Sequence, residues 1–195
     1  ERYQYDEDQN RTGYTDQAGA QWQWTYDEQG NRLTADGPLG WHRDWAYNER
    51  HQVTRMTEKV DADSERTSSF TYDDKGNLTE FCNALNACGS VTYDERGLPL
   101  RMTDLNGNTT VHQYDSEGDL ISITDAEGAV TRLDHDDLGR LHSLTKPLGS
   151  EFRYSRDENS NLVAVDGPLG FHLEFSYDAD DLLERLFCVA SENQN

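Results

Sequence analysis

A single phrase recurs through this chain at a fixed distance, and this repeat constrains the fold more than any other feature. The phrase is an aromatic residue, a Tyr-Asp pair, two variable residues and often a Gly, as in "FTYDDKGNLTEF" at 70–81. Successive units are 21 residues apart, with one spacing of 25, and the anchors are Tyr5, Tyr26, Tyr47, Tyr72, Tyr93, Tyr114, His135, Arg156 and Tyr177. A sustained period of this length indicates a repeat architecture in which each unit packs on its neighbours.

Each unit carries the signature of a tight turn directly after its anchor. An Asp follows the anchor in most units, as at Asp27, Asp73, Asp94 and Asp115, and three residues later comes a Gly at Gly30, Gly76, Gly97, Gly118 and Gly139. An Asp that opens a turn accepts hydrogen bonds from neighbouring amides, and Gly adopts the left-handed conformation that such a turn needs. A second turn follows about ten residues later, as in "DLNG" at 104–107. Each unit therefore predicts strand, turn, strand, turn.

The stretches between turns alternate in polarity, which is typical of strands. Trp22, Trp24 and Tyr26 show this alternation. The alternation is broken once on the second strand of each unit, and we attribute the break to a β-bulge after the first turn. A uniformly helical fold is excluded, because turn formers recur about every ten residues and would break a helix of average length. The sequence predicts an all-β fold of about nine antiparallel hairpins in an extended, curved or spiralling sheet. Residues 1–195 form one array, with a longer, mobile loop near 58–69.

The motif Tyr-Asp-x-x-Gly-[Asn/Arg]-Leu, seen as "YDDKGNL" at 72–78 and "HDDLGRL" at 135–141, resembles the YD repeat of the Rhs family. That family includes bacterial Rhs proteins, shell proteins of insecticidal toxin complexes and the teneurins. The resemblance implies a large hollow shell of spiralling β-sheet that encloses a C-terminal toxin in the bacterial members. It also implies a protein that is secreted or delivered to target cells. The family's self-cleavage motif is not matched, and we read "DGPLG" at 36–40 and 166–170 as turns.

Composition excludes several classes of partner. The chain has 195 residues with 38 acidic and 17 basic side chains, a net charge of −21, so a nucleic-acid partner is not expected. No apolar run approaches the roughly 18 residues of a membrane-spanning helix, and no signal peptide is visible. The chain starts and stops in mid-pattern, which we interpret as a segment of a longer shell protein.

No catalytic, metal or cofactor site is predicted. Every recurring Asp is explained by a turn, and the six His show no metal-binding spacing. Three cysteines do not make a disulfide framework. A local bridge between Cys82 and Cys88 is geometrically feasible, but we expect free, buried thiols.

Two functional classes remain. In the first, the chain is a non-catalytic wall segment whose partners are the rest of its parent shell and the enclosed toxin. In the second, it is a carbohydrate- or receptor-binding module that uses exposed aromatics, with Trp41 and Trp45 as candidates. Since an open array leaves two unpaired strand edges, we also expect the chain to associate edge to edge.

Overall fold

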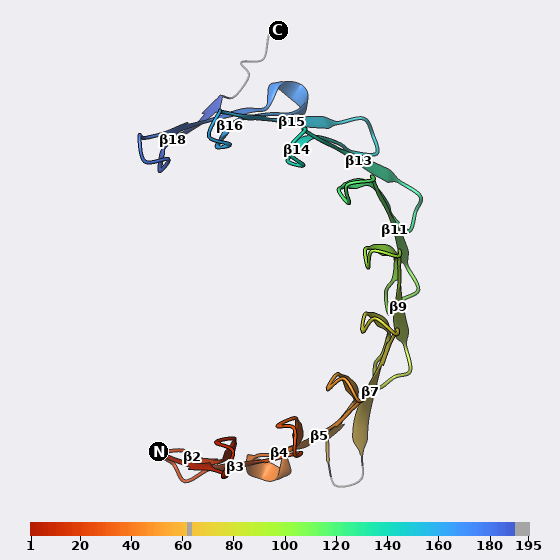
Figure 1. The fold of residues 1–195 in the computed structure, drawn as a ribbon, viewed down its shortest axis with the longest axis vertical. Coiled ribbons are helices and arrows are strands. Elements are labelled where there is room, and N and C mark those ends of the chain that lie inside the picture. The colour runs from red at the N-terminus through yellow and green to blue at the C-terminus, as the bar shows by residue number, and fades with distance from the viewer. Residues whose placement is uncertain (62–63, 190–195) are drawn as a thin grey trace. The chain divides into compact units, whose positions relative to one another are not determined.

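The computed structural model describes residues 1–61 and 64–189 and is built almost entirely of antiparallel β-strands. Eighteen strands and two short 3-10 turns are found in this part of the chain, so the predicted fold class is confirmed. The residues form two compact units, Glu1–Thr92 with Met102–Asn108, and Tyr93–Arg101 with Thr109–Asn195. In both units the strands follow one another in chain order (Figure 1).

In the first unit each strand pairs with the next one along the chain. The strands are β1 (Arg2–Tyr5), β2 (Arg11–Thr15), β3 (Gln21–Tyr26), β4 (Arg32–Asp36), β5 (His42–Tyr47), β6 (Val53–Lys59), β7 (Glu65–Tyr72), β8 (Leu78–Cys82) and β9 (Cys88–Tyr93). A 3-10 turn, η1 (Pro38–Gly40), joins β4 to β5. The next strand, β10 (Pro99–Thr103), is divided between the two units.

The second unit repeats this arrangement with the same pairing of consecutive strands. Its strands are β11 (Thr109–Tyr114), β12 (Leu120–Thr124), β13 (Val130–His135), β14 (Leu141–Thr145), β15 (Glu151–Arg156), β16 (Leu162–Asp166), β17 (His172–Tyr177) and β18 (Leu183–Val189). The second 3-10 turn, η2 (Pro168–Gly170), joins β16 to β17. Both "DGPLG" segments are therefore turns, as the sequence predicts.

A bulge lies beside eight of the nine anchor residues, where the sequence placed it. In the hairpin of β7 and β8, Thr71 is opposite Glu80 but Tyr72 is opposite Leu78, so one residue of β8 is left out of the register. The same shift occurs at Tyr26, Tyr114 and Tyr177. The turn glycines Gly30, Gly76, Gly97, Gly118 and Gly139 all have positive φ, between 73° and 103°. This is the left-handed region, where a Cβ is unfavourable.

Apolar side chains line up across neighbouring strands, but few are buried. In the first unit the rings of Tyr3, Tyr14 and Trp22 succeed one another with centroids 5.1 and 5.2 Å apart. Ala35 and Val165, at the same repeat position, are the buried hydrophobic residues among those described. No large side chain in residues 1–61 and 64–189 is fully buried. Stability therefore depends on contacts and hydrogen bonds between adjacent strands rather than on a thick core.

The prediction of a long loop near 58–69 is wrong for most of that range. Lys59 pairs with Glu65 and Glu58 pairs with Arg66, so β6 and β7 are extended by paired residues. The four additional residues thus lengthen two strands, and the side-chain alternation is kept. The amide of Val60 donates to the carbonyl of Ser64, the same spacing as in the other turns. Residues 62 and 63 lie outside the described residues.

The two helical segments of the described chain are single 3-10 turns, and neither has the length or apolar character to cross a bilayer.

Candidate functional site

The recurring Asp is the hub of each first turn. The Oδ1 of Asp73 accepts hydrogen bonds from the amides of Lys75 (2.9 Å) and Asn77 (2.8 Å), and its Oδ2 accepts one from the Asn77 side chain (2.9 Å). Asp27 has the same partners at Gln29 and Asn31. Hydrogen bonds from the Asn77 side chain and backbone amides hold the pKa of Asp73 below its ordinary value. These carboxylates are ionised and occupied by the turn, which makes them poor proton donors for catalysis.

Five of the recurring Tyr residues fasten their hairpin to the one before it. Each Tyr hydroxyl donates to the backbone carbonyl of the residue that opens the second strand of the preceding hairpin. The pairs are Tyr26 to Arg11 (2.9 Å), Tyr47 to Arg32 (2.8 Å), Tyr72 to Val53 (2.8 Å), Tyr114 to Pro99 (3.0 Å) and Tyr177 to Leu162 (2.9 Å). Four of these acceptors lie opposite an anchor at the register shift, so in these hairpins the Tyr hydroxyl bonds to the bulge; they are Arg11, Arg32, Val53 and Leu162. The sequence showed the Tyr but not its acceptor.

Two units lack this tether because their anchor is not Tyr. His135 and Arg156 occupy the anchor positions of their hairpins, opposite Leu141 and Leu162. The Nδ1 of His135 and the Nε of Arg156 are buried without a hydrogen-bond partner among the described residues. Asp136 next to His135 still organises its turn, and the hydrogen bond from the Arg140 side chain (2.8 Å) lowers the pKa of Asp136 to about 2.

The aromatic candidates Trp41 and Trp45 lie close together in β5 and its turn, and Arg43 connects them. The Arg43 guanidinium carbon is 5.4 Å from the Trp41 ring centroid and 6.0 Å from that of Trp45. Glu58 on β6 accepts hydrogen bonds from Arg43 (2.7 Å) and from Trp41 Nε1 (3.2 Å). Hydrogen bonding by these two residues lowers the pKa of Glu58. The Trp41 ring is thereby held in one orientation while 37% of the residue is exposed.

Gly37 supplies the space in which Trp41 is seated. Its backbone is extended (φ −139°, ψ −179°), so it is not needed for a left-handed turn. A Cβ at Gly37 would lie 2.9 Å from Cε3 of Trp41 and 3.2 Å from the Trp22 ring. Gly167 is in the same situation between Phe152 and Phe171 in the second unit.

An open groove of about 510 Å³ runs along Trp41, and its lining is Pro38, Leu39, Gly40, Trp41, Lys59, Val60 and Asp61. An aromatic ring with flanking cationic and anionic side chains is able to stack on and hydrogen-bond a polar ligand. Trp45 does not line this groove. Of the two aromatic candidates, Trp41 is the one in a position to contact a ligand there.

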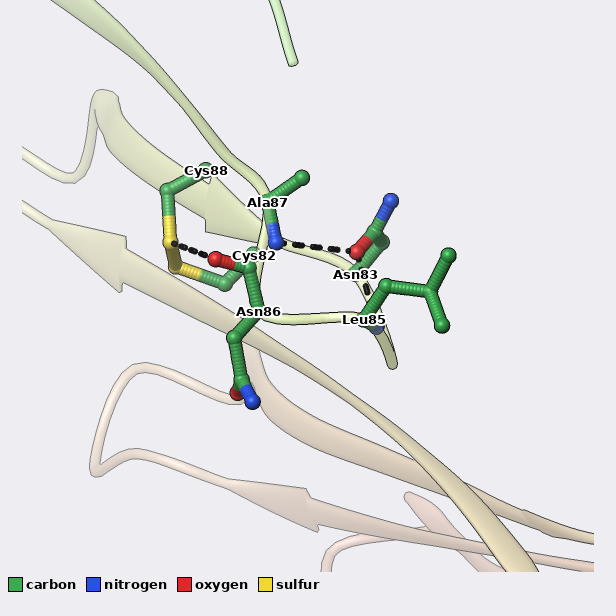
Figure 2. The surroundings of a disulfide bond; sticks show 6 residues. All are labelled: Cys82, Asn83, Leu85, Asn86, Ala87 and Cys88. Atoms are coloured by element: carbon green, nitrogen blue, oxygen red, sulfur yellow. Dashed lines mark hydrogen bonds between the residues drawn. A yellow bond between two sulfur atoms is a disulfide. The ribbon is translucent and has the colours of Figure 1, made fainter. Parts of the chain in front are cut away.

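Cys82 and Cys88 form a disulfide bond across the second turn of their hairpin, which contradicts the expectation of free thiols (Figure 2). The two residues are direct partners in the register of β8 and β9, with Cα atoms 4.0 Å apart. Direct cross-strand partners bring their side chains together on one face of the sheet, and this proximity allows the two sulfur atoms to bond. Cys188 is a free thiol, as expected, but it is exposed rather than buried.

The disulfide lies beside a carboxylate. Within residues 1–61 and 64–189, one group of three residues of metal-ligating type comes together, and it consists of Glu80, Cys82 and Cys88. Its ligand atoms all lie within 4.8 Å of one another. Two of the histidines are instead paired with carboxylates: His42 contacts Asp36 (2.7 Å), and His172 contacts Asp166 (2.7 Å) and Glu174 (3.1 Å). The carboxylates of Asp166 and Glu174 raise the pKa of His172.

Comparison with known proteins agrees with this geometry. The model of the RHS Repeat family matches residues 5–40, 93–130, 114–151 and 135–172, which together exceed half of the chain. The chain is similar to one chain in the structure of the Photorhabdus luminescens Tc holotoxin pore with a mutation in TccC3, with 14% identity and a TM-score of 0.58 over 98% of this chain and 12% of that chain. A crystal structure of TcdB2-TccC3 shows 12% identity and a TM-score of 0.34, covering 97% of this chain and 16% of that chain. No curated protein matched the sequence.

Proposed function

Since the chain belongs to the RHS repeat family, we propose that it is a non-catalytic wall segment of a shell that encloses a toxin or effector in its parent protein. The observation that carries this proposal is that the recurring side chains are engaged in hydrogen bonds within the sheet. Each Asp is bonded within its turn, and five of the Tyr hydroxyls are bonded to the preceding hairpin. The repeated residues build the sheet.

The resemblance in fold supports the same proposal. The matched Tc holotoxin chain is about eight times longer than the matched part, since the match covers 12% of it. A segment of this kind would have the rest of the parent shell and its cargo as partners. In this proposal the parent is secreted, or delivered to target cells, as part of a bacterial toxin.

Enclosure is tested on the parent chain by limited proteolysis. We expect the cargo region to resist protease in the unaltered protein and to become sensitive when Gly76→Val and Gly118→Val disrupt two turns. Leu148→Ala is the matched control, because Leu148 is 98% exposed at a turn tip. A cargo region that is cleaved equally in all three proteins would contradict enclosure.

The absence of catalysis is tested on the purified chain, with assays for nuclease, protease and glycosidase turnover. We expect no turnover above that of a heat-denatured sample. Reproducible turnover that is lost when one Asp is changed would overturn the wall proposal.

A second candidate function is carbohydrate binding, and the groove along Trp41 is the observation that favours it. The ring is held by Glu58 and Arg43 and presents a fixed apolar surface next to Lys59 and Asp61. A glycan array would show binding that Trp41→Ala abolishes and Phe171→Ala, at the equivalent position of the other "DGPLG" turn, leaves intact. Binding that survives Trp41→Ala, or no binding at all, removes this candidate.

A further inference from the structure

We propose that Glu80, Cys82 and Cys88 form a binding site for a thiophilic divalent cation, with Zn²⁺ as its natural ligand, when the disulfide is reduced. The three ligand atoms lie within 4.8 Å of one another. Zn²⁺ binds thiolate sulfur at about 2.3 Å and carboxylate oxygen at about 2.0–2.2 Å, so the ligands of one tetrahedral ion are about 3.3–3.8 Å apart. Side-chain rotation is enough to reach this arrangement.

The backbone places the three side chains on one face. Glu80 and Cys82 are two residues apart on β8, and side chains at that separation point to the same side of a strand. Cys88 on β9 is the direct cross-strand partner of Cys82, with Cα atoms 4.0 Å apart. The site would hold three protein ligands, two sulfur and one oxygen, and leave the fourth position for water.

The turn does not need the disulfide to keep these residues together. Asn83 Oδ1 accepts hydrogen bonds from the amides of Leu85 (2.9 Å) and Ala87 (3.1 Å), and both are drawn in Figure 2. The Asn83 amide donates to the carbonyl of Ala87 (2.9 Å), and the Asn86 amide donates to that of Asn83 (2.9 Å). After reduction, these four bonds still hold Cys82 opposite Cys88, so the ligands stay preorganised.

The chemistry balances with an ordinary dithiol as reductant. The dithiol gives two electrons and two protons, its own disulfide forms, and the bond between the two cysteine sulfurs breaks to leave two thiols. Binding of Zn²⁺ then displaces both thiol protons to solvent, because thiolate is the metal ligand. Reagents reach the site, since Glu80 and Cys88 are exposed and Cys82 is half-buried. The excess of acidic residues, with a net charge of −21, favours the approach of cations.

Whether the site binds metal would therefore depend on the redox state of the compartment in which the protein is found. Reducing cytosol keeps thiols free, and oxidising surroundings outside the cell favour the disulfide. With export, which rests on the proposed function, one hairpin end would be closed by a metal ion inside the cell and by a covalent bond outside it. This inference is independent of the enclosed cargo and of the carbohydrate candidate.

The test uses the whole chain with Cys188→Ser, so that only the paired cysteines bind metal. After reduction and removal of metal, Zn²⁺ affinity is measured by competition with a chromophoric chelator, and Cd²⁺ reports thiolate ligation through its ultraviolet charge-transfer absorption. We expect one ion per reduced chain and none on the oxidised chain. Cys82→Ser or Cys88→Ser should abolish the charge-transfer signal. Glu80→Gln should weaken Zn²⁺ binding by roughly tenfold or more. Losses of this size are found even when the residue changed only hydrogen-bonds to a metal ligand, so loss of a direct ligand should cost at least as much.

Glu95→Gln is the matched control, a glutamate in a neighbouring turn that is outside the cluster, and it should leave affinity unchanged. Circular dichroism of the reduced chain and of each variant confirms that the strands persist. Equal Zn²⁺ binding by the oxidised and reduced chains, or by the reduced chain and the Cys82→Ser variant, would overturn the proposal. Affinity that is unaffected by Glu80→Gln would overturn the three-ligand site.

Discussion

Replacing Tyr72 with Phe removes one tether between hairpins and leaves the ring in place. The hydroxyl of Tyr72 donates to the carbonyl of Val53 at 2.8 Å in a partly buried setting. A neutral hydrogen bond of this kind contributes about 0.5–1.5 kcal/mol to the free energy of unfolding. We therefore expect a loss of about 1 kcal/mol, the middle of this range. For a chain of this size, that lowers Tm by about 2–4 °C.

Urea unfolding followed by circular dichroism measures the global effect, and amide hydrogen exchange locates it. A repeat array opens locally, so exchange should accelerate chiefly in β6 and β7. Tyr5→Phe is the matched control. Tyr5 is 60% exposed, and its hydroxyl has no partner among the described residues, so this change should be neutral.

The reciprocal change adds a tether. His135→Tyr should place a hydroxyl near the carbonyl of Leu120, the equivalent acceptor of the preceding hairpin, and raise the free energy of unfolding by a similar amount. If Tyr72→Phe is neutral while Tyr72→Leu destabilises the chain, the ring alone matters and the reasoning on tethers is refuted.

Gly76→Val should cost about 1–2 kcal/mol, because φ at Gly76 is +91°, and urea unfolding should show a smaller loss for Gly76→Asn. Gly37→Ala should shift the tryptophan fluorescence, since its Cβ would lie 2.9 Å from Trp41; an unchanged spectrum would contradict the packing described. The pKa of Asp136 is lowered from 3.8 to about 2, so its contribution to stability is complete above pH 4 and is lost as the pH falls towards 2; NMR titration that gives an ordinary value would disprove this. Sedimentation across a hundredfold dilution should reveal edge-to-edge association, and a monomer at all concentrations would count against it.

Local patterns were enough to predict the hairpins, because the turn residues act within five positions of one another. Asp73 and Gly76 determine their turn by bonds that stay inside it. The bulge also follows from a local break in alternation, and the register shift at Tyr72 confirms it.

What the sequence did not reveal depends on pairing between strands. The partner of the Tyr72 hydroxyl is 19 residues away and is identified only once the register is known. Gly37 is needed because the ring of Trp22 on β3 and the ring of Trp41, just before β5, converge on it. Cys82 and Cys88 are joined because they are direct partners across β8 and β9. This pairing depends on the strand register, which the number and spacing of the cysteines do not determine.

The tyrosine tethers all point the same way along the chain, from a hairpin back to the one before it. During synthesis from the N-terminus, each new hairpin therefore emerges after its acceptor carbonyl has already been made, and it can attach at once. For the five tethered hairpins, the hairpin made before therefore provides the acceptor carbonyl for the one made after it. A truncation from the C-terminal side leaves an unused acceptor, which water can satisfy, whereas a truncation from the N-terminal side leaves a tyrosine without its acceptor.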